Sequence, residues 1–301
     1  MIFGLNKNGK KIDIENSLKE EQYYCPCCGT ELIQKKGLIN SWHFAHKSLS
    51  ECDNWYEENE WSRMWIKMFN SEYREVVIKN ESDNRKRIAD IKYKSLVLKL
   101  QSKSVSGEEF IERIEYFSKE NNLVYLVDCR DKDIEYLKTK RTHNFVWKHA
   151  YKFGNIDKFN SNFYLFFQIN DNTLIRVVWN KEGFKYFGGY TYNINEFKEV
   201  LTMIADNNTP STIVKWDNER YKKECFLLLE KILKVDMRKY NYKLINLFCK
   251  CTETPYLREV ILYKSNKIEY IINSKKFKDE KHKVNYVFKI LEKTIEEKPI
   301  L

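Results

Sequence analysis

Two pairs of potential metal ligands stand close together near the N-terminus. Cys25 and Cys28 are separated by two residues in "YYCPCCGTEL", and His43 and His46 are separated by two in "GLINSWHFAH". Thiolate and imidazole are ligands that zinc prefers, and two closely spaced pairs suit its tetrahedral geometry. We therefore predict a zinc site built from Cys25, Cys28, His43 and His46. With four protein ligands it would be structural, because no position would remain for a reactive water.

Two further cysteines leave the ligand set open. Cys27 could compete with Cys28, and Cys52 could be a spare ligand. The alternative is a set of reduced thiols and surface histidines without metal. A bound zinc would help to fold a segment of about fifty residues that is otherwise too small to be stable alone.

The composition bounds the classes of protein that the chain can belong to. Of the 301 residues, 43% are hydrophobic and 32% charged, and no long uncharged apolar run suggests a membrane span. The N-terminal apolar stretch is too short for a secretory signal, so we expect a cytoplasmic protein with no membrane partner. The formal net charge of +10 favours polyanionic partners, above all nucleic acid, although a lysine-rich composition also arises from nucleotide bias in a genome.

Residues from about 55 to 130 alternate between helical and strand patterns. The stretch "EENEWSRMWIKMF" predicts a helix, because its apolar residues recur on one face: Trp61, Met64, Trp65, Met68 and Phe69. The stretches "REVVIK", "RIADIKY" and "SLVLKLQ" predict three strands separated by turn residues.

A second helix and a fourth strand complete this pattern. Ser106 and Glu109 form a capping-box pair, and the helix that follows would bury Phe110, Ile111, Ile114 and Phe117. The apolar run "LVYLVD" suits a parallel strand buried on both faces. The predicted order is helix, three strands, helix, strand.

The rest of the chain divides into a β-rich and a helical part. From about 144 to 200 the stretches "FYLFFQI", "LIRVVW" and "FKYFGGYTY" predict strands, with a turn at the two glycines from 188. After "DNNTPST" the pattern is mostly helical. We therefore predict an α/β protein with a segment over 1–54, a domain with a β-rich extension over 55–200 and a helical region over 201–301.

Several short motifs, taken in order, resemble those of the CoiA-like competence protein family. They are "YYCPCCGTEL", "WHFAH", "NEWSRMW", "RIADI", "LQSKSVSGEEFIER" and "FVWKHAYK". The resemblance spans residues 1 to about 200 and does not extend to the last hundred. It implies a zinc-knuckle-like segment followed by a PD-(D/E)xK, or restriction-endonuclease-like, core in a protein that handles incoming DNA. The predicted order of helices and strands agrees with that fold.

The resemblance also implies a set of site residues. Glu60 would be the acid on the first helix, Asp90 the metal ligand on a strand, and Gln101 would stand at the lysine position of the general motif. Glu60 and Asp90 would hold Mg²⁺ or Mn²⁺ in an active enzyme. Arg113 matches the family pattern, whereas Ser62 stands where the family has histidine.

Lys99 is the departure that matters most, because the family carries Glu two residues before the Gln. On a strand over 96–101, Lys99 shares a face with Val97 and Gln101. A lysine beside a magnesium site should weaken metal binding strongly, since like charges about 4 Å apart repel by roughly 4 kcal/mol at an effective dielectric constant near 20.

Three outcomes remain open for this site. Lys99 could replace the metal electrostatically and pair with Asp90 or a DNA phosphate in a dead nuclease. Glu109 or Glu108 could supply the missing acid, although capping is the ordinary role of Glu109. Or the alignment is displaced and Lys99 is a solvated strand residue. These outcomes lead to two functional hypotheses. The chain is either a metal-dependent nuclease, or a non-catalytic DNA-binding or adaptor protein with a partner in recombination, DNA uptake or phage defence.

Overall fold

The computed structural model describes nine stretches of the chain, which are residues 1–38, 41–48, 59–80, 84–137, 144–147, 162–181, 184–207, 210–250 and 254–296. The chain divides into two compact units, each with helices and strands, so the predicted α/β class is confirmed. The first unit holds Met1–Lys132 together with strand β12 and helix α3. The second holds most of the remaining chain, including every residue from 210 onward.

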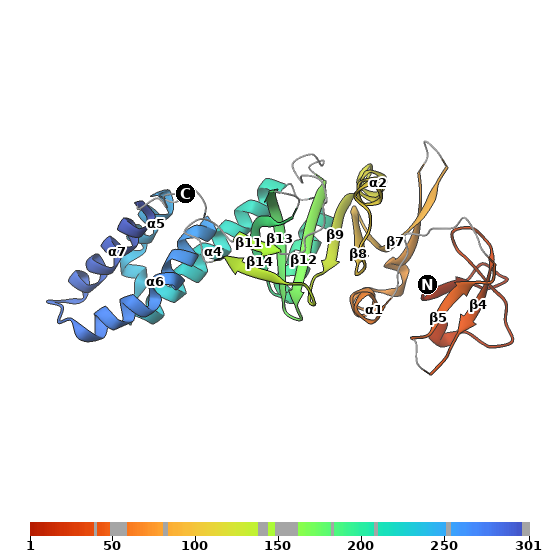
Figure 1. The fold of residues 1–301 in the computed structure, drawn as a ribbon, viewed down its shortest axis with the longest axis horizontal. Helices are drawn as coiled ribbons and strands as arrows, with labels where there is room; N and C mark the ends of the chain where they lie inside the picture. The colour runs from red at the N-terminus through yellow and green to blue at the C-terminus, as the bar shows by residue number, and fades with distance from the viewer. Residues whose placement is uncertain are drawn as a thin grey trace. The chain divides into compact units, whose positions relative to one another are not determined.

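The N-terminal segment of the first unit is a small antiparallel sheet (Figure 1). Its strands lie in the order β2-β1-β3-β4-β5, with bounds Lys11–Asp13, Phe3–Leu5, Tyr23–Tyr24, Glu31–Lys35 and His43–His46. A 3-10 turn, η1, covers Ile14–Asn16. Gly29 has a φ of +75°, a left-handed conformation that a residue with a Cβ adopts only at a cost. This conformation makes the turn between β3 and β4, where the three cysteines of "YYCPCCGTEL" stand.

The rest of the first unit follows the order of helices and strands predicted from the sequence. Their bounds are α1 Glu60–Lys67, β6 Arg74–Lys79, β7 Lys86–Tyr93, β8 Leu96–Gln101, α2 Gly107–Ser118, β9 Asn122–Asp128, β12 Phe163–Asn170 and α3 Ile194–Ala205, with a 3-10 turn, η2, over Ser71–Tyr73. The strands lie in the order β6-β7-β8-β9-β12. Strands β6, β7 and β8 are antiparallel, whereas β8 and β9 are parallel, as expected from the crossover through α2.

The two faces of this sheet are covered by different helices. Tyr125 is the register partner of Lys99, and its ring packs edge to face against Phe110 of α2 at 5.0 Å. On the other face, α1 and α3 meet through an edge-to-face contact of Trp65 and Phe197 at 5.3 Å. Figure 1 shows α1 and α2 on opposite sides of β7 and β8. Side chains that alternate along a strand therefore enter two separate environments.

Three details of the sequence prediction were wrong. Met64 and Met68 are 41% and 42% exposed, and α1 buries Ser62 and Ile66 beside its two tryptophans instead. Ile111 is 38% exposed, and α2 buries Arg113 in its place. The glycines at 188 and 189 lie inside strand β14 rather than in a turn.

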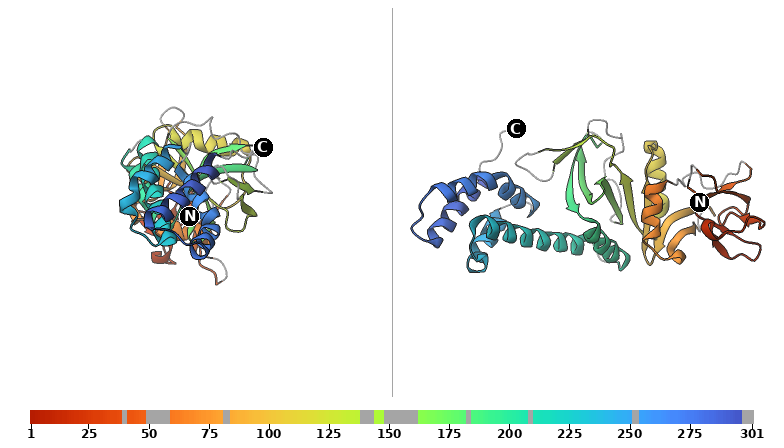
Figure 2. Two further views of the ribbon diagram at one scale, coloured as in Figure 1. Left: turned by 90° about the vertical axis from the view of Figure 1, so that its left-hand side faces the viewer. Right: turned by 90° about the horizontal axis from the view of Figure 1, so that it is seen from below.

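The second unit combines strands with a helical region. Strands β10 Ile134–Leu137, β11 Asn144–Trp147 and β14 Tyr186–Tyr192 are neighbours in that order, and β13 runs over Thr173–Lys181. The helices are α4 Pro210–Leu233, α5 Asn241–Lys250, α6 Thr254–Ser274 and α7 Glu280–Glu296, with a 3-10 turn, η4, over Met237–Tyr240. Figure 2 shows the long α4 in teal and α6 and α7 in blue.

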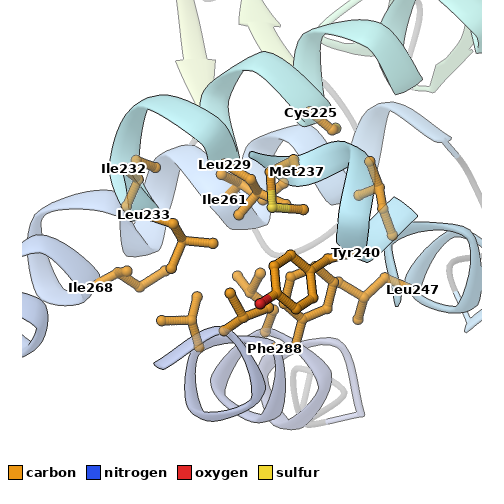
Figure 3. Close-up of a cluster of buried hydrophobic side chains, with 14 of the residues drawn as sticks. Cys225, Leu229, Ile232, Leu233, Met237, Tyr240, Leu247, Ile261, Ile268 and Phe288 are labelled. Carbon is orange, nitrogen blue, oxygen red and sulfur yellow. The ribbon is translucent and has the colours of Figure 1, made fainter. Parts of the chain in front are cut away.

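A hydrophobic core holds these four helices together. Leu229, Ile261 and Phe288 are each at most 3% exposed and come from α4, α6 and α7. Figure 3 shows them converging with Met237 and Leu247 into one cluster. Among the described residues, no helix combines the length and the apolar character that crossing a lipid bilayer requires.

Candidate functional site

Three of the four predicted zinc ligands lie together. The ligand atoms of Cys25, Cys28 and His46 all fall within 4.8 Å of one another. Cys28 Sγ is 3.5 Å from His46 Nε2. A tetrahedral zinc ion, with bonds of about 2.3 Å to sulfur and about 2.05 Å to nitrogen, would hold such a pair about 3.6 Å apart. The donor set and its spacing therefore fit a metal ion of the zinc type.

Backbone hydrogen bonds hold the turn that carries the cysteines. The Cys25 N–H donates to the carbonyl of Thr30 at 2.8 Å, and the Gly29 N–H donates to the carbonyl of Cys25 at 2.9 Å. The Cys27 N–H points at Cys25 Sγ from 3.4 Å, where it can stabilise a thiolate. Burial lowers the pKa of His46, which favours the neutral imidazole that binds metals.

The fourth predicted ligand, His43, is not part of the group. His43 and His46 are three residues apart on strand β5, so their side chains leave opposite faces of the sheet. His43 Nδ1 lies 2.8 Å from the carbonyl oxygen of Ser41. Cys27 also faces elsewhere, because its thiol contacts the carbonyl of Lys86 at 3.6 Å. Cys52 lies outside the described residues, so a closed site with four protein ligands remains a prediction.

Asp90 and Lys99 form a buried ion pair on the α2 face of the larger sheet. Their exposed fractions are 1% and 0%. Lys99 Nζ lies 3.2 Å from Asp90 Oδ2 and 3.3 Å from Oδ1, and it also donates to the carbonyl of Ile88 at 3.3 Å. The Leu100 N–H donates to Asp90 Oδ2 at 2.7 Å. Both carboxylate oxygens thus have partners within the protein, and the ammonium stands where a bound cation would contact them.

Gln101 lies on the same face of β8 as Lys99 and belongs to a second cluster of polar side chains. Its Oε1 accepts hydrogen bonds from Arg113 Nη1 at 2.6 Å and from the Tyr125 hydroxyl at 2.8 Å. Arg113, which is 1% exposed, also pairs with the carboxylate of Glu109. Burial raises the pKa of Tyr125, so its hydroxyl stays protonated as a donor. Gln101 is therefore held by protein partners.

Glu60 does not join these residues. It is exposed in the first turn of α1. That helix is anchored to the other face of the sheet, because Trp61 and Trp65 donate to the side-chain oxygen of Gln168 at 2.7 and 2.9 Å. Among the described residues, no group of three or more metal-ligating side chains includes Asp90.

Glu109, which was considered as a source of the missing acid, and Ser62 both have other partners in the structure. The Ser106 hydroxyl accepts from the Glu109 N–H at 3.1 Å, which confirms the predicted N-cap, but the carboxylate of Glu109 pairs with Arg113. Ser62, which stands where the family has histidine, forms a reciprocal capping box with Asn59. Of the motif "FVWKHAYK", residues 148–152 lie outside the described part of the chain.

The contacts of Glu75 could not be predicted from the sequence. The carboxylate of Glu75 accepts hydrogen bonds from the N–H groups of Ile2 at 2.7 Å and Phe3 at 2.9 Å. Glu75 is 2% exposed and has a φ of 44°, a conformation that costs a residue other than glycine free energy. It connects strand β1 to strand β6, and a glutamate in "REVVIK" gives no indication of this contact.

Comparison with known proteins finds similarity over part of the chain. Residues 6–54 match the family described as "Competence protein CoiA, N-terminal domain". Over these residues the chain is similar to the N-terminal domain of CoiA. It is 30% identical over 112 residues to "Competence protein CoiA" of Bacillus subtilis (strain 168). That match covers 34% of this chain and 30% of the relative, so the chain spans about a third of the length of the CoiA protein that it matches. No solved structure matches the chain.

The first prediction concerns the ligands of the metal centre. We expect purified protein to carry zinc, and Cys28→Ser and His46→Ala to lose most of it, because each removes a donor from the group. His43→Ala and Cys27→Ser are matched controls that should keep the metal. Elemental analysis and a zinc-chelator titration measure both effects. Equal loss from His43→Ala and His46→Ala would show that the grouping is wrong.

The second prediction concerns the buried ion pair. Lys99→Met should lower the free energy of unfolding by about 3 to 5 kcal/mol, because it leaves the Asp90 carboxylate buried without its cation. The double variant Lys99→Met with Asp90→Asn should lose less than the sum of the two single variants. Lys67→Met removes an exposed lysine from its pair with Glu15 and should cost less than about 1 kcal/mol. Denaturant unfolding measures all four, and additive single effects would contradict the pair.

Proposed function

We propose that this CoiA-like chain is a DNA-handling protein whose restriction-endonuclease-like core has lost metal-dependent cleavage and binds DNA without cutting it. The observation that carries the proposal is the buried pair of Lys99 and Asp90. The order of helices and strands and the antiparallel and parallel pairing of β6 to β9 support the assignment of the core.

The ion pair argues against a magnesium site in this protein. A phosphodiester hydrolase needs carboxylates that are free to hold Mg²⁺ or Mn²⁺, which would activate water and neutralise charge on the phosphate. Here Lys99 contacts both oxygens of Asp90 from within 3.3 Å. A divalent cation would have to displace this ammonium from a site that is closed to solvent.

The remaining residues of the implied site support the same conclusion. Gln101 is engaged by Arg113 and Tyr125, so its side chain is not available to orient water or phosphate. Glu60 belongs to a helix on the other face of the sheet. The chain has polar residues at the site positions of the implied nuclease, but their side chains contact other protein groups instead of a metal or substrate.

Binding to DNA follows from charge rather than from this site. The excess of 53 Lys and Arg over 43 Asp and Glu favours association with polyanions. Retention of the fold without cleavage would allow the protein to hold DNA for another protein. Zinc at Cys25, Cys28 and His46 would stabilise the N-terminal segment, and Glu75 attaches that segment to β6.

The third prediction tests the absence of cleavage. Protein incubated with single-stranded and double-stranded DNA should bind with an affinity that falls as salt rises, and should not cut with Mg²⁺ or Mn²⁺ above the level of an Asp90→Ala control. Gel shift at several salt concentrations and a cleavage time course measure this. Metal-dependent cutting that Asp90→Ala abolishes would overturn the proposal, as would a failure to bind DNA at low salt.

The fourth prediction reverses the substitution. Lys99→Glu should lower the melting temperature without metal, because two carboxylates are then buried side by side. Mn²⁺ should restore stability to this variant and leave the parent unchanged. Lys99→Gln, which removes the charge without adding an acid, is the matched control and should not respond to Mn²⁺. An equal response of all three proteins would show that position 99 does not govern metal binding.

A further inference from the structure

The first unit contains a pocket on the face of the sheet away from Lys99 and Asp90. It has a volume of about 350 Å³ and lies between the C-terminal end of α1, the ends of β7 and β8, and α3. Leu96 on β8, which alternates with Val97, Lys99 and Gln101, forms part of its floor. Ligand pockets usually measure about 300 to 1,000 Å³, so this one suits a small ligand.

Aromatic and sulfur-containing side chains form the walls of this pocket. Tyr73 and Tyr93 line it and contact each other edge to face, with ring centroids 4.8 Å apart. Trp65 lines it from α1, and Phe69 lines it from the turn after that helix, beside Met68, which is 42% exposed. Flat apolar walls of this kind favour a planar aromatic ligand, which stacks against rings at little cost in desolvation.

Polar groups stand at the rim. Lys198 and Asn70 both line the pocket and are exposed. Among the described residues no carboxylate pairs with the Lys198 ammonium, and the Asn70 side chain makes no capping bond to the turn that follows it. Lys94 follows Tyr93 in the sequence, and its Nζ lies 5.2 Å from the centre of the Tyr93 ring and pairs with Asp206. The rim therefore offers a cation for a phosphate and an amide for the edge of a base.

We propose that this pocket binds one unpaired base of a single-stranded nucleic acid, with the base against Tyr73 and Tyr93 and a flanking phosphate on Lys198. The proposal deepens the function proposed above and rests on it. Stacking on aromatic rings tolerates any base, because every base has a π face. A base in a duplex is already stacked and paired, so a pocket of this size would select single strands.

The experiment compares variants that keep or remove the ring. Tyr93→Leu and Tyr73→Leu should weaken binding of a fluorescent single-stranded oligonucleotide by about 5- to 150-fold, the range for losing one base stack. Tyr93→Phe should bind like the parent, since it keeps the ring. Lys198→Ala should weaken binding and reduce the salt dependence by about one phosphate contact. Tyr242→Leu and Lys289→Ala, on exposed positions of α5 and α7, are the matched controls.

A second measurement locates the base directly. A single-stranded oligonucleotide with 5-iodouracil at one position should crosslink on irradiation to a peptide that contains Tyr73 or Tyr93. Crosslinking elsewhere, together with full binding by Tyr93→Leu, would overturn the pocket and leave DNA binding intact. Failure of the parent protein to bind any nucleic acid would overturn both proposals. Binding of free nucleotide monophosphates without oligonucleotide binding would indicate a small-molecule site instead.

Discussion

The burial of Lys99 against Asp90 constrains the rest of the core. Each charge would carry a large desolvation penalty alone, so neither can be buried unless the other is held beside it. Holding them requires β7 and β8 in one register, the Leu100 N–H on the carboxylate, and α2 over the face, where the Phe117 ring centre lies 5.9 Å from the lysine Nζ. The pair therefore specifies register and helix position together, and it engages both carboxylate oxygens of Asp90.

The N-terminal segment depends on a different kind of constraint. Its strands have only two to five residues, so its apolar core is small, and a metal ion would supply much of its stability. Glu75 adds a second attachment, since its carboxylate satisfies two backbone N–H groups of the first strand. The metal would act within the segment, through Cys25, Cys28 and His46, whereas Glu75 joins the segment to β6, so the two contributions are separate.

The sequence predicted the order of helices and strands but not every buried face. Apolar periodicity located α1 correctly, yet it could not show that Ser62 would be buried by a capping box while Met64 and Met68 stay exposed. The four candidate zinc ligands were predicted from spacing alone, and the structure groups three of them. His43 lies apart because residues three apart on a strand face opposite ways. The pairing of Lys99 with Asp90 was one of three outcomes that the sequence left open, and only the structure decided among them. The contact of Glu75 was not predicted, since its partners lie more than 70 residues away in the sequence.

The two faces of the sheet hold separate groups of side chains, so the chemistry proposed for one face does not depend on the other. On the α2 face, Asp90 pairs with Lys99, and Gln101 accepts hydrogen bonds from Arg113 and Tyr125, so these polar groups have protein partners. On the α1 and α3 face, aromatic residues leave an open pocket with a cation at its rim. Because side chains alternate along β7 and β8, substitutions on one face leave the other face nearly unchanged. The proposed loss of cleavage on one side is therefore compatible with the proposed binding on the other, and both faces belong to strands whose register the ion pair helps to fix.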